Sequence, residues 1–167
     1  MFIGIDPGNN GAIAIIYEGM GTYDAYPLPV VKYKVGKRNR TMIDIPEFIW
    51  MFSTMVNNCN GIEPVYVCLE RVGARPDQGV TSMFNFGFGY GVLTGISHCF
   101  SKEVKSVTPQ KWKKTVLSDD HTKEGAIEYV NNFFPYVNLM PGRKKVPHDG
   151  MADALCIAQY CKIINSP

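Results

Sequence analysis

Short apolar segments separated by turn-forming residues characterise the first part of the chain. Residues 2–6 and 12–17 are apolar runs, and the Pro- and Gly-containing residues 7–11 between them are a strong turn signal, so the pattern predicts an antiparallel hairpin. Residues 22–26 alternate between polar and apolar side chains and predict a third strand that extends the hairpin to a meander. Residues 29–41 contain five cations, a Pro and a Gly but no acid, which indicates a solvent-exposed loop.

From residue 44 onward the pattern alternates between helices and strands. Asp44 and Pro46 are typical of the first turn of a helix, which residues 57–61 end. Residues 65–70 are apolar up to a final acid and predict a buried strand. The remaining expected elements are a strand at 104–107, a short helix opened by Thr108 as cap and Pro109, and helices at 81–100, 121–134 and 151–164. This order predicts an α/β domain with a mixed five-stranded sheet and flanking helices.

The expected helix at residues 81–100 is rich in glycine. Its glycines are Gly87, Gly89, Gly91 and Gly95. Each costs ~1 kcal/mol relative to Ala in a helix, so we expect compensation, either from close packing on the sheet or from the close approach of a ligand backbone. The same helix carries Phe84, Phe86 and Phe88. We expect most of these rings to be core, with one at the helix start free to insert between DNA bases.

Composition places the chain among ordinary globular proteins. It has 167 residues, of which 46% are hydrophobic and 19% charged, so we expect a single domain spanning residues 1–167. No apolar run reaches the ~18 residues that span a bilayer, and the N-terminus lacks the basic segment of a signal peptide. The five cysteines form no CxxC pair, which favours buried thiols in a reducing cytoplasm over disulfides or a zinc site.

Four carboxylates occupy positions where chemistry is expected. Asp6 ends the first strand, Glu70 ends the central strand, and Asp149 and Asp153 are four residues apart, so on a helix they share a face. Ligand sites of open α/β sheets lie beyond the strand ends. Acids gathered there would repel one another, and divalent cations such as Mg²⁺ would relieve that repulsion.

Each of these residues also has a structural interpretation. Asp6 is followed by Pro-Gly and fits an ordinary turn, Glu70 could cap or pair with a nearby Arg, and Asp149 could cap the last helix. His148 fits a hydrogen-bonding loop residue. The metal hypothesis therefore depends on the four acids sharing one site.

The cations are unevenly distributed although the net charge is only +2. Thirteen of the 17 basic residues form three clusters: Lys32, Lys34, Lys37, Arg38 and Arg40; Lys102, Lys105, Lys111, Lys113 and Lys114; and Arg143, Lys144 and Lys145. Cations around an acidic centre suit a nucleic-acid backbone held across a metal site, although each cluster could also be a solvated surface.

Five motifs occur in the order found in a known family. They lie at residues 4–8, at the strand ending in Glu70, and at residues 78–84, 107–114 and 148–155. They are distributed over nearly the whole chain, which resembles the RuvC family of Holliday-junction resolvases, especially the RuvC-like nucleases of bacteriophages. The resemblance implies a ribonuclease H-like fold, a homodimer, and action in the cytoplasm of an infected bacterial host.

The resemblance also implies a reaction. It implies paired nicking of four-way DNA junctions by two-metal hydrolysis with Mg²⁺ or Mn²⁺, which gives 5′-phosphate and 3′-hydroxyl ends. Asp6, Glu70 and Asp153 match the catalytic metal ligands. Residues implied in DNA binding are Met83 and Phe84 at the junction centre, and Lys111, Lys113, Lys114, Arg143, Lys144 and Lys145 on phosphates.

The fourth ligand departs from the family's pattern. In the cellular bacterial enzymes the last two ligands are commonly three residues apart, which corresponds here to Gly150. We therefore expect Asp149 as the fourth catalytic ligand and keep His148 as an alternative ligand or proton carrier. The departure leaves open a broader substrate range that includes flaps, forks and other branched DNA. A nuclease of the same fold that acts on RNA–DNA hybrids is a separate alternative that the sequence also leaves open.

Two other classes of protein are alternatives to a junction nuclease. A junction-binding protein without catalysis is disfavoured by the complete set of four acids. A sugar kinase or ATPase of the actin-like type also opens with a strand, an Asp and a Gly-rich turn, but it needs a second similar domain, for which 167 residues are too few.

Overall fold

The computed structural model describes residues 1–8, 10–36, 38–57, 64–73, 79–117, 121–142 and 145–166. Its strands are β1 (Phe2–Asp6), β2 (Ala12–Tyr17), β3 (Thr22–Pro27), β4 (Val30–Val35), β5 (Arg38–Ile43), β6 (Tyr66–Glu70) and β7 (Glu103–Val107). Its α-helices are α1 (Ile45–Asn57), α2 (Val80–Phe100), α3 (Pro109–Val116), α4 (Lys123–Phe133) and α5 (Asp149–Asn165), and a 3₁₀ turn spans Glu18–Met20.

The main sheet has five strands in the order β3-β2-β1-β6-β7. β1 runs antiparallel to β2 and parallel to β6, and β6 runs parallel to β7. The carboxyl ends of β1 and β6 therefore lie side by side at one edge. The expected mixed five-stranded α/β architecture is confirmed.

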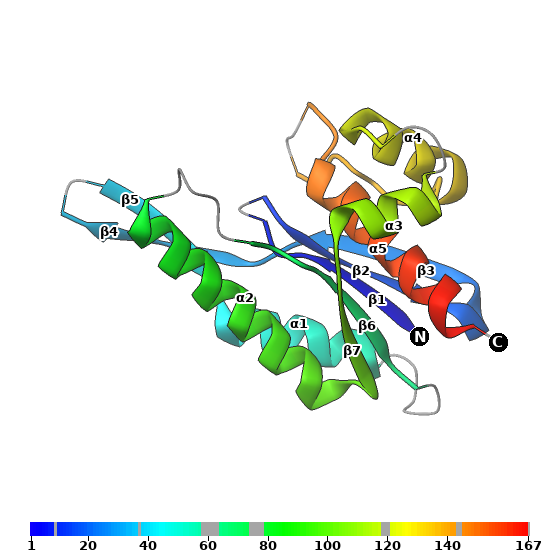
Figure 1. Cartoon of the computed structure of the whole chain (residues 1–167), viewed down its shortest axis with the longest axis horizontal. Coiled ribbons are helices and arrows are strands. Elements are labelled where there is room, and N and C mark those ends of the chain that lie inside the picture. The colour runs from blue at the N-terminus through cyan, green and yellow to red at the C-terminus, as the bar shows by residue number, and fades with distance from the viewer. Residues whose placement is uncertain are drawn as a thin grey trace.

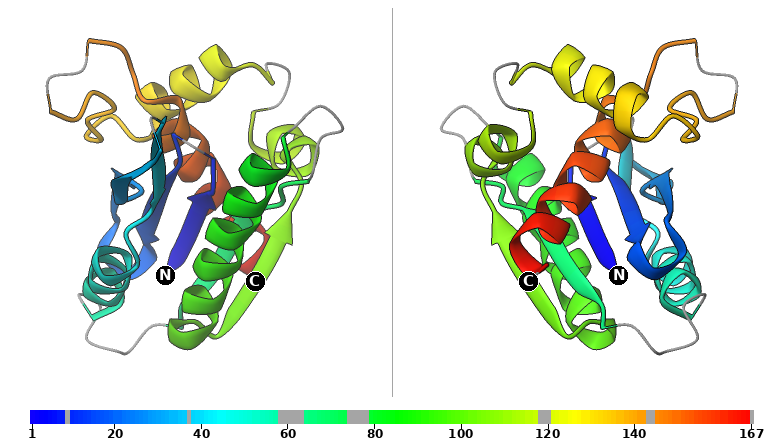
Figure 2. Two further views of the ribbon diagram at one scale, coloured as in Figure 1. Left: turned by 90° about the vertical axis from the view of Figure 1, so that its left-hand side faces the viewer. Right: turned by 90° about the vertical axis from the view of Figure 1, so that its right-hand side faces the viewer.

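Helices cover both faces of this sheet (Figures 1 and 2). Ile3 and Ile5 of β1 point into a core shared with Phe48 and Phe52 of α1. Because successive strand residues face opposite sides, Phe2 and Gly4 point to the other face, which α5 covers together with α3 and α4.

Gly4 sets the closeness of α5 to the sheet. A Cβ atom at this position would lie 2.1 Å from the backbone oxygen of Ala154 and 2.3 Å from the backbone nitrogen of Ala158. Only glycine permits this backbone-to-backbone contact, so the position of α5 over β1 is fixed at residue 4.

The expectation of a loop at residues 29–41 is wrong. β4 and β5 pair as an antiparallel hairpin from Val30↔Ile43 to Val35↔Arg38, and Gly36 has the left-handed φ of 61° that its turn requires. The cations that suggested a solvated loop alternate with other residues along both strands, as expected for a two-stranded ribbon outside the main sheet. Lys37 lies outside the described residues.

The expectation of close packing at the glycines of α2 is also wrong. A Cβ atom at Gly87, Gly89, Gly91 or Gly95 would meet no atom within 4 Å. The aromatic rings of α2 are not core either: Phe84 is 73% exposed, Phe88 is 43% exposed, and Phe86 is half-buried. Apolar residues occur all round this helix, so its sequence does not define the buried face.

Smaller differences concern helix ends and cysteines. The Thr108 side chain makes no capping hydrogen bond, although Pro109 does open α3, and α5 begins two residues earlier than expected. Cys68, Cys156 and Cys161 are buried thiols as expected, whereas Cys99 is exposed. Cys59 and the expected helix end at residues 58–61 lie outside the described residues. None of the described helices combines the length and apolarity needed to cross a membrane.

Candidate active site

The four acids singled out in the sequence lie around one edge of the main sheet. Asp6 and Glu70 end the neighbouring parallel strands β1 and β6. Asp149 and Asp153 lie in the first two turns of α5, which packs across those strands. Glu70, Asp153 and Asp149 each act on Asp6 through charge repulsion, so the structure brings all four into one electrostatic unit.

Asp6 is the most perturbed of these acids. Burial, reinforced by the charges of Glu70, Asp153 and Asp149, raises its pKa to about 7, although the Gly8 N–H donates a 2.9 Å hydrogen bond to its Oδ1 and opposes the shift. Without a compensating cation, Asp6 therefore binds a proton far more readily near neutral pH than an ordinary carboxyl group does.

Asp153 is half-buried and has one unsatisfied oxygen. Its Oδ1 is inaccessible to water and has no hydrogen-bond partner. Burial raises its pKa to about 6, the repulsion from Glu70 and Asp149 adds to the shift, and the Lys113 ammonium opposes it. A buried carboxylate oxygen without a donor is costly, so this atom is a natural contact for a ligand that supplies positive charge.

Glu70 is held by a tryptophan. The Nε1–H of Trp112, a fully buried side chain on α3, donates a 2.8 Å hydrogen bond to Glu70 Oε1. Burial raises the pKa of Glu70, and this hydrogen bond and the charge of Lys113 oppose the shift. The bond leaves Glu70 little freedom to turn away from the sheet edge.

Asp149 is in a different electrostatic state. The Lys123 ammonium donates to its Oδ2, and Asn10 Nδ2 donates to its Oδ1 at 2.7 Å. The hydrogen bond from Lys123 is the main reason why the pKa of Asp149 is lowered, and Asn10 contributes in the same direction. Lys123 thus already neutralises one of the four acids.

Gly150 explains the spacing of the acids on α5. A Cβ atom at residue 150 would lie 2.1 Å from the backbone oxygen of Asn10 and 3.0 Å from Asp6 Oδ2. A side chain cannot occupy this position without displacing the β1–β2 turn. An acid three residues before Asp153 is therefore excluded here, and Asp149 lies one residue earlier.

His148 has a structural role at the start of α5. It is the N-cap residue of α5, and its Nδ1 accepts a hydrogen bond from the Met151 N–H at 3.2 Å. The side chain is buried. Its role as an alternative metal ligand stays a prediction.

The acids do not form a finished metal site as they stand. Among the described residues, no group of three or more His, Cys, Asp or Glu side chains is arranged to hold an ion. The donor chemistry nevertheless fits a hard divalent cation, because Asp6 and Asp153 are half-buried carboxylates whose repulsion by the neighbouring acids is only partly offset by nearby lysines.

The predicted DNA-binding residues lie mainly on α2 and α3. Met83 is half-buried and Phe84 exposed at the start of α2. On α3, Lys111 and Lys114 are exposed, whereas Lys113 is half-buried, bonds to the His121 carbonyl at 3.0 Å and lies among the acids. Lys145 is exposed and lines a cavity of about 540 Å³ next to Asp149; Arg143 and Lys144 lie outside the described residues.

Three contacts of the site carried no recognisable signal in the sequence, although Trp112 itself lies within the motif at residues 107–114. Lys123 is 26 residues from its partner Asp149, and Trp112 is 42 residues from Glu70. Asn10 is part of a turn whose composition explains its presence without reference to Asp149. Such pairs are created by the packing of α3, α4 and α5 and leave no periodic pattern.

No family model and no curated protein matches this chain. Solved structures do match: the T. thermophilus RuvC in complex with a Holliday junction substrate is 16% identical, with 93% of this chain and 89% of that chain covered and a TM-score of 0.50. A T. thermophilus RuvC structure is 19% identical, covers 93% of this chain and 89% of that chain, and has a TM-score of 0.48. The yeast mitochondrial Holliday junction resolvase Ydc2 is 16% identical, covers 97% of this chain and 83% of that chain, and has a TM-score of 0.47. The likeness to the first of these, together with the sheet order, establishes a ribonuclease H-like fold.

Proposed function

We propose that this protein is a metal-dependent endonuclease that resolves four-way DNA junctions by paired nicking. The observation that carries the proposal is the pair of half-buried carboxylates Asp6 and Asp153, both with a raised pKa, which lie with Glu70 where β1, β6 and α5 meet. The resolvase fold supports it, since the structure that shares this fold at a TM-score of 0.50 is a RuvC bound to a Holliday junction substrate.

The acids are assigned as the ligands of divalent cations. Asp6, Glu70 and Asp153 would hold the ions, with Asp149 as the fourth ligand once it exchanges Lys123 for a metal. Mg²⁺ or Mn²⁺, two ions per site, would stabilise the attacking and leaving oxygens of the phosphodiester and yield 5′-phosphate and 3′-hydroxyl ends. The chain itself contributes the orientation of Glu70 through Trp112 and a closely placed cation, Lys113, beside the acids.

The test is a nicking assay on an immobile four-way junction labelled on each strand in turn, with Mg²⁺. Linear duplex, flap, fork and RNA–DNA hybrid of matched sequence serve as alternative substrates. Symmetric paired cuts in the junction alone are the expected result. Equal cutting of flaps, forks or hybrids would establish a broader nuclease, and tight junction binding without any metal-dependent cut would leave a binding protein. An origin in a bacteriophage stays a prediction from the sequence.

Paired cuts require two active sites, and α2 offers the surface for a homodimer. Gly87, Gly91 and Gly95 recur at helical spacing on its exposed side, where a Cβ atom would meet nothing, and the exposed ring of Phe88 lies beside them. Figure 2 shows α2 uncovered on its outer side. Glycines in a row let a second helix approach closely, and a two-fold dimer matches the symmetry of a four-way junction.

Gly91→Arg is expected to convert the dimer to a monomer of 18.7 kDa without unfolding it, because a Cβ atom at residue 91 has no neighbour within 4 Å and the residue is exposed. Light scattering measures the mass, and circular dichroism checks the fold. Gly73→Arg is the matched control, since Gly73 is equally unobstructed but lies outside α2. An unchanged dimer in the Gly91 variant would remove α2 from the interface.

The exposed lysines of α3 are proposed to bind DNA phosphates. Lys111 and Lys114 lie on the outer face of α3, opposite Trp112 and Val116 in the core. Replacing both by Gln should weaken junction binding and reduce the slope of log affinity against log salt by about two. Lys102→Gln, at the far end of β7, is the control. A slope that does not change would show that neither lysine contacts a phosphate.

A further inference from the structure

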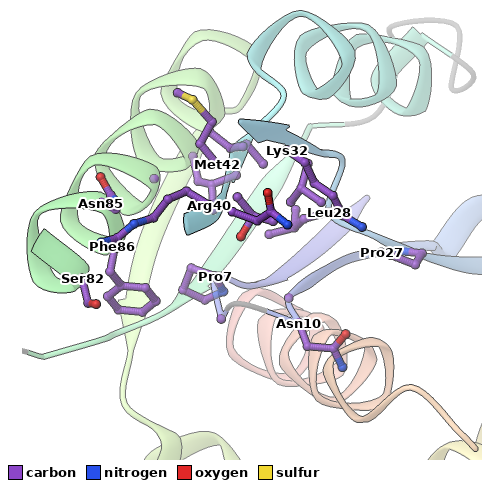
Figure 3. Close-up of a pocket in the computed structure, with 18 of the residues that line it drawn as sticks. Pro7, Asn10, Pro27, Leu28, Lys32, Arg40, Met42, Ser82, Asn85 and Phe86 are labelled. Carbon is purple, nitrogen blue, oxygen red and sulfur yellow. The ribbon is translucent and has the colours of Figure 1, made fainter. Parts of the chain in front are cut away.

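A cleft separates the β4–β5 hairpin from α2 beside the acid site. It encloses a cavity of about 690 Å³, within the ~300–1,000 Å³ typical of ligand pockets. Pro7, Gly8 and Asn10 of the β1–β2 turn form one wall, so the cavity begins directly after Asp6 (Figure 3). None of the motifs that suggested a nuclease includes the hairpin.

The hairpin side of the cleft is cationic. Lys32 of β4 and Arg40 of β5 line the cavity, and Arg40 extends toward Asn85 and Phe86 on α2 (Figure 3). Within the described part of the chain, the side chains of Lys32 and Arg40 have no hydrogen-bond or ion-pair partner. Residues 30–43 contain no acid at all, so the field of the hairpin favours an anion.

The floor of the cleft is apolar. Leu28, Leu93, Pro7 and Met42 line it, and Phe86 presents its ring near Pro7 (Figure 3). A phosphate backbone alone would need no such surface. An unpaired base does, because its flat face is free to stack on an aromatic ring, whereas in a duplex that face is covered by its neighbours. The side-chain amide of Asn85 adds a donor and an acceptor for a base edge.

We propose that the β4–β5 hairpin and α2 hold an unpaired DNA strand next to the acid site, with its phosphates at Lys32 and Arg40 and a base stacked on Phe86. This inference rests on the proposed function for the identity of the DNA, but the strand-binding site itself is testable without cleavage. It gives the enzyme a means of selecting positions where base pairs are already open, and so of choosing the strand that it cuts.

The test measures binding of a short fluorescent oligothymidylate and of a duplex of the same length by anisotropy, in EDTA so that no cleavage contributes. Phe86→Leu should weaken oligothymidylate binding about 10-fold and leave duplex binding within a factor of two, because only the unpaired base loses its stacking partner. Arg40→Gln, a surface variant that does not threaten the fold, should weaken oligothymidylate binding by a similar factor. Lys102→Gln is the charge-matched control and should have little effect.

Three results would overturn the proposal. These are no binding of oligothymidylate by the wild type, an unaltered affinity in both cleft variants, or an equal loss of duplex and oligothymidylate binding in Phe86→Leu. Failure of the nuclease proposal looks different: the junction stays intact in Mg²⁺ while oligothymidylate still binds in the cleft. Conversely, if the protein cuts junctions but neither Phe86→Leu nor Arg40→Gln weakens oligothymidylate binding, only the proposal of strand binding in the cleft is refuted.

Discussion

Glu70→Gln is expected to lower the rate of junction nicking by at least about 1,000-fold, equivalent to ~4 kcal/mol of transition-state stabilisation. The variant removes one charge from the proposed metal site but keeps the side chain's shape. Its amide oxygen can still accept the hydrogen bond from Trp112, so the fold and the junction affinity should persist. Single-turnover nicking and anisotropy binding separate the two effects.

Glu103→Gln is the matched control for this experiment. Glu103 begins β7, whereas Glu70 ends the neighbouring strand β6, so the two acids lie at opposite ends of parallel strands. Glu103 forms an exposed ion pair with Lys105, which contributes little to stability. Nicking by Glu70→Gln within 10-fold of the wild type would rule out Glu70 as a required ligand, and an equal loss in both variants would indicate a general effect of charge.

The metal-free protein should lose stability as the pH rises from 4 to 8. Burial raises the pKa of Asp6 from 3.8 to about 7 and that of Asp153 from 3.8 to about 6. Over this range the folded state binds more protons than the unfolded state, so the free energy of unfolding falls with increasing pH. For Asp6 alone the loss is of the order of 4 kcal/mol. Urea unfolding in EDTA at pH 4.5 and pH 8 measures it.

Asp6→Asn isolates this contribution. Asparagine keeps an oxygen for the Gly8 N–H but carries no charge, so the variant should exceed the wild type in stability at pH 8 and match it at pH 4.5. Adding Mg²⁺ at pH 8 should stabilise the wild type and leave the variant nearly unchanged. If the difference in free energy of unfolding between the wild type and Asp6→Asn is the same at pH 8 as at pH 4.5, Asp6 is not desolvated in the folded protein.

The acids and the main sheet could be predicted because their signals are local. An apolar run that stops at an acid marks both a strand and its functional end, as at Asp6 and Glu70. The spacing of Asp149 and Asp153 likewise places both on one side of a helix. These features need no knowledge of which elements pack together.

The features that were missed depend on tertiary packing. Residues 30–43 form a cationic hairpin whose alternation was obscured by its Gly and by the neighbouring Pro, signals that loops share with ribbons. Lys123 and Trp112 reach the acids only because α4 and α3 pack near α5. The exposed ring of Phe84 agrees with the one aromatic expected to be free at the helix start, but the exposure of Phe88 was not predicted, since apolar residues surround α2 and no side of it is marked as outer.

The contact at Gly4 determines how the proposed active site tolerates sequence change. Because α5 rests on the backbone of β1 there, the separation between Asp6 and Asp153 is set by main-chain atoms and not by the sizes of core side chains. Neutral drift in the core can therefore replace Leu, Ile and Val for one another without altering the spacing of the acids.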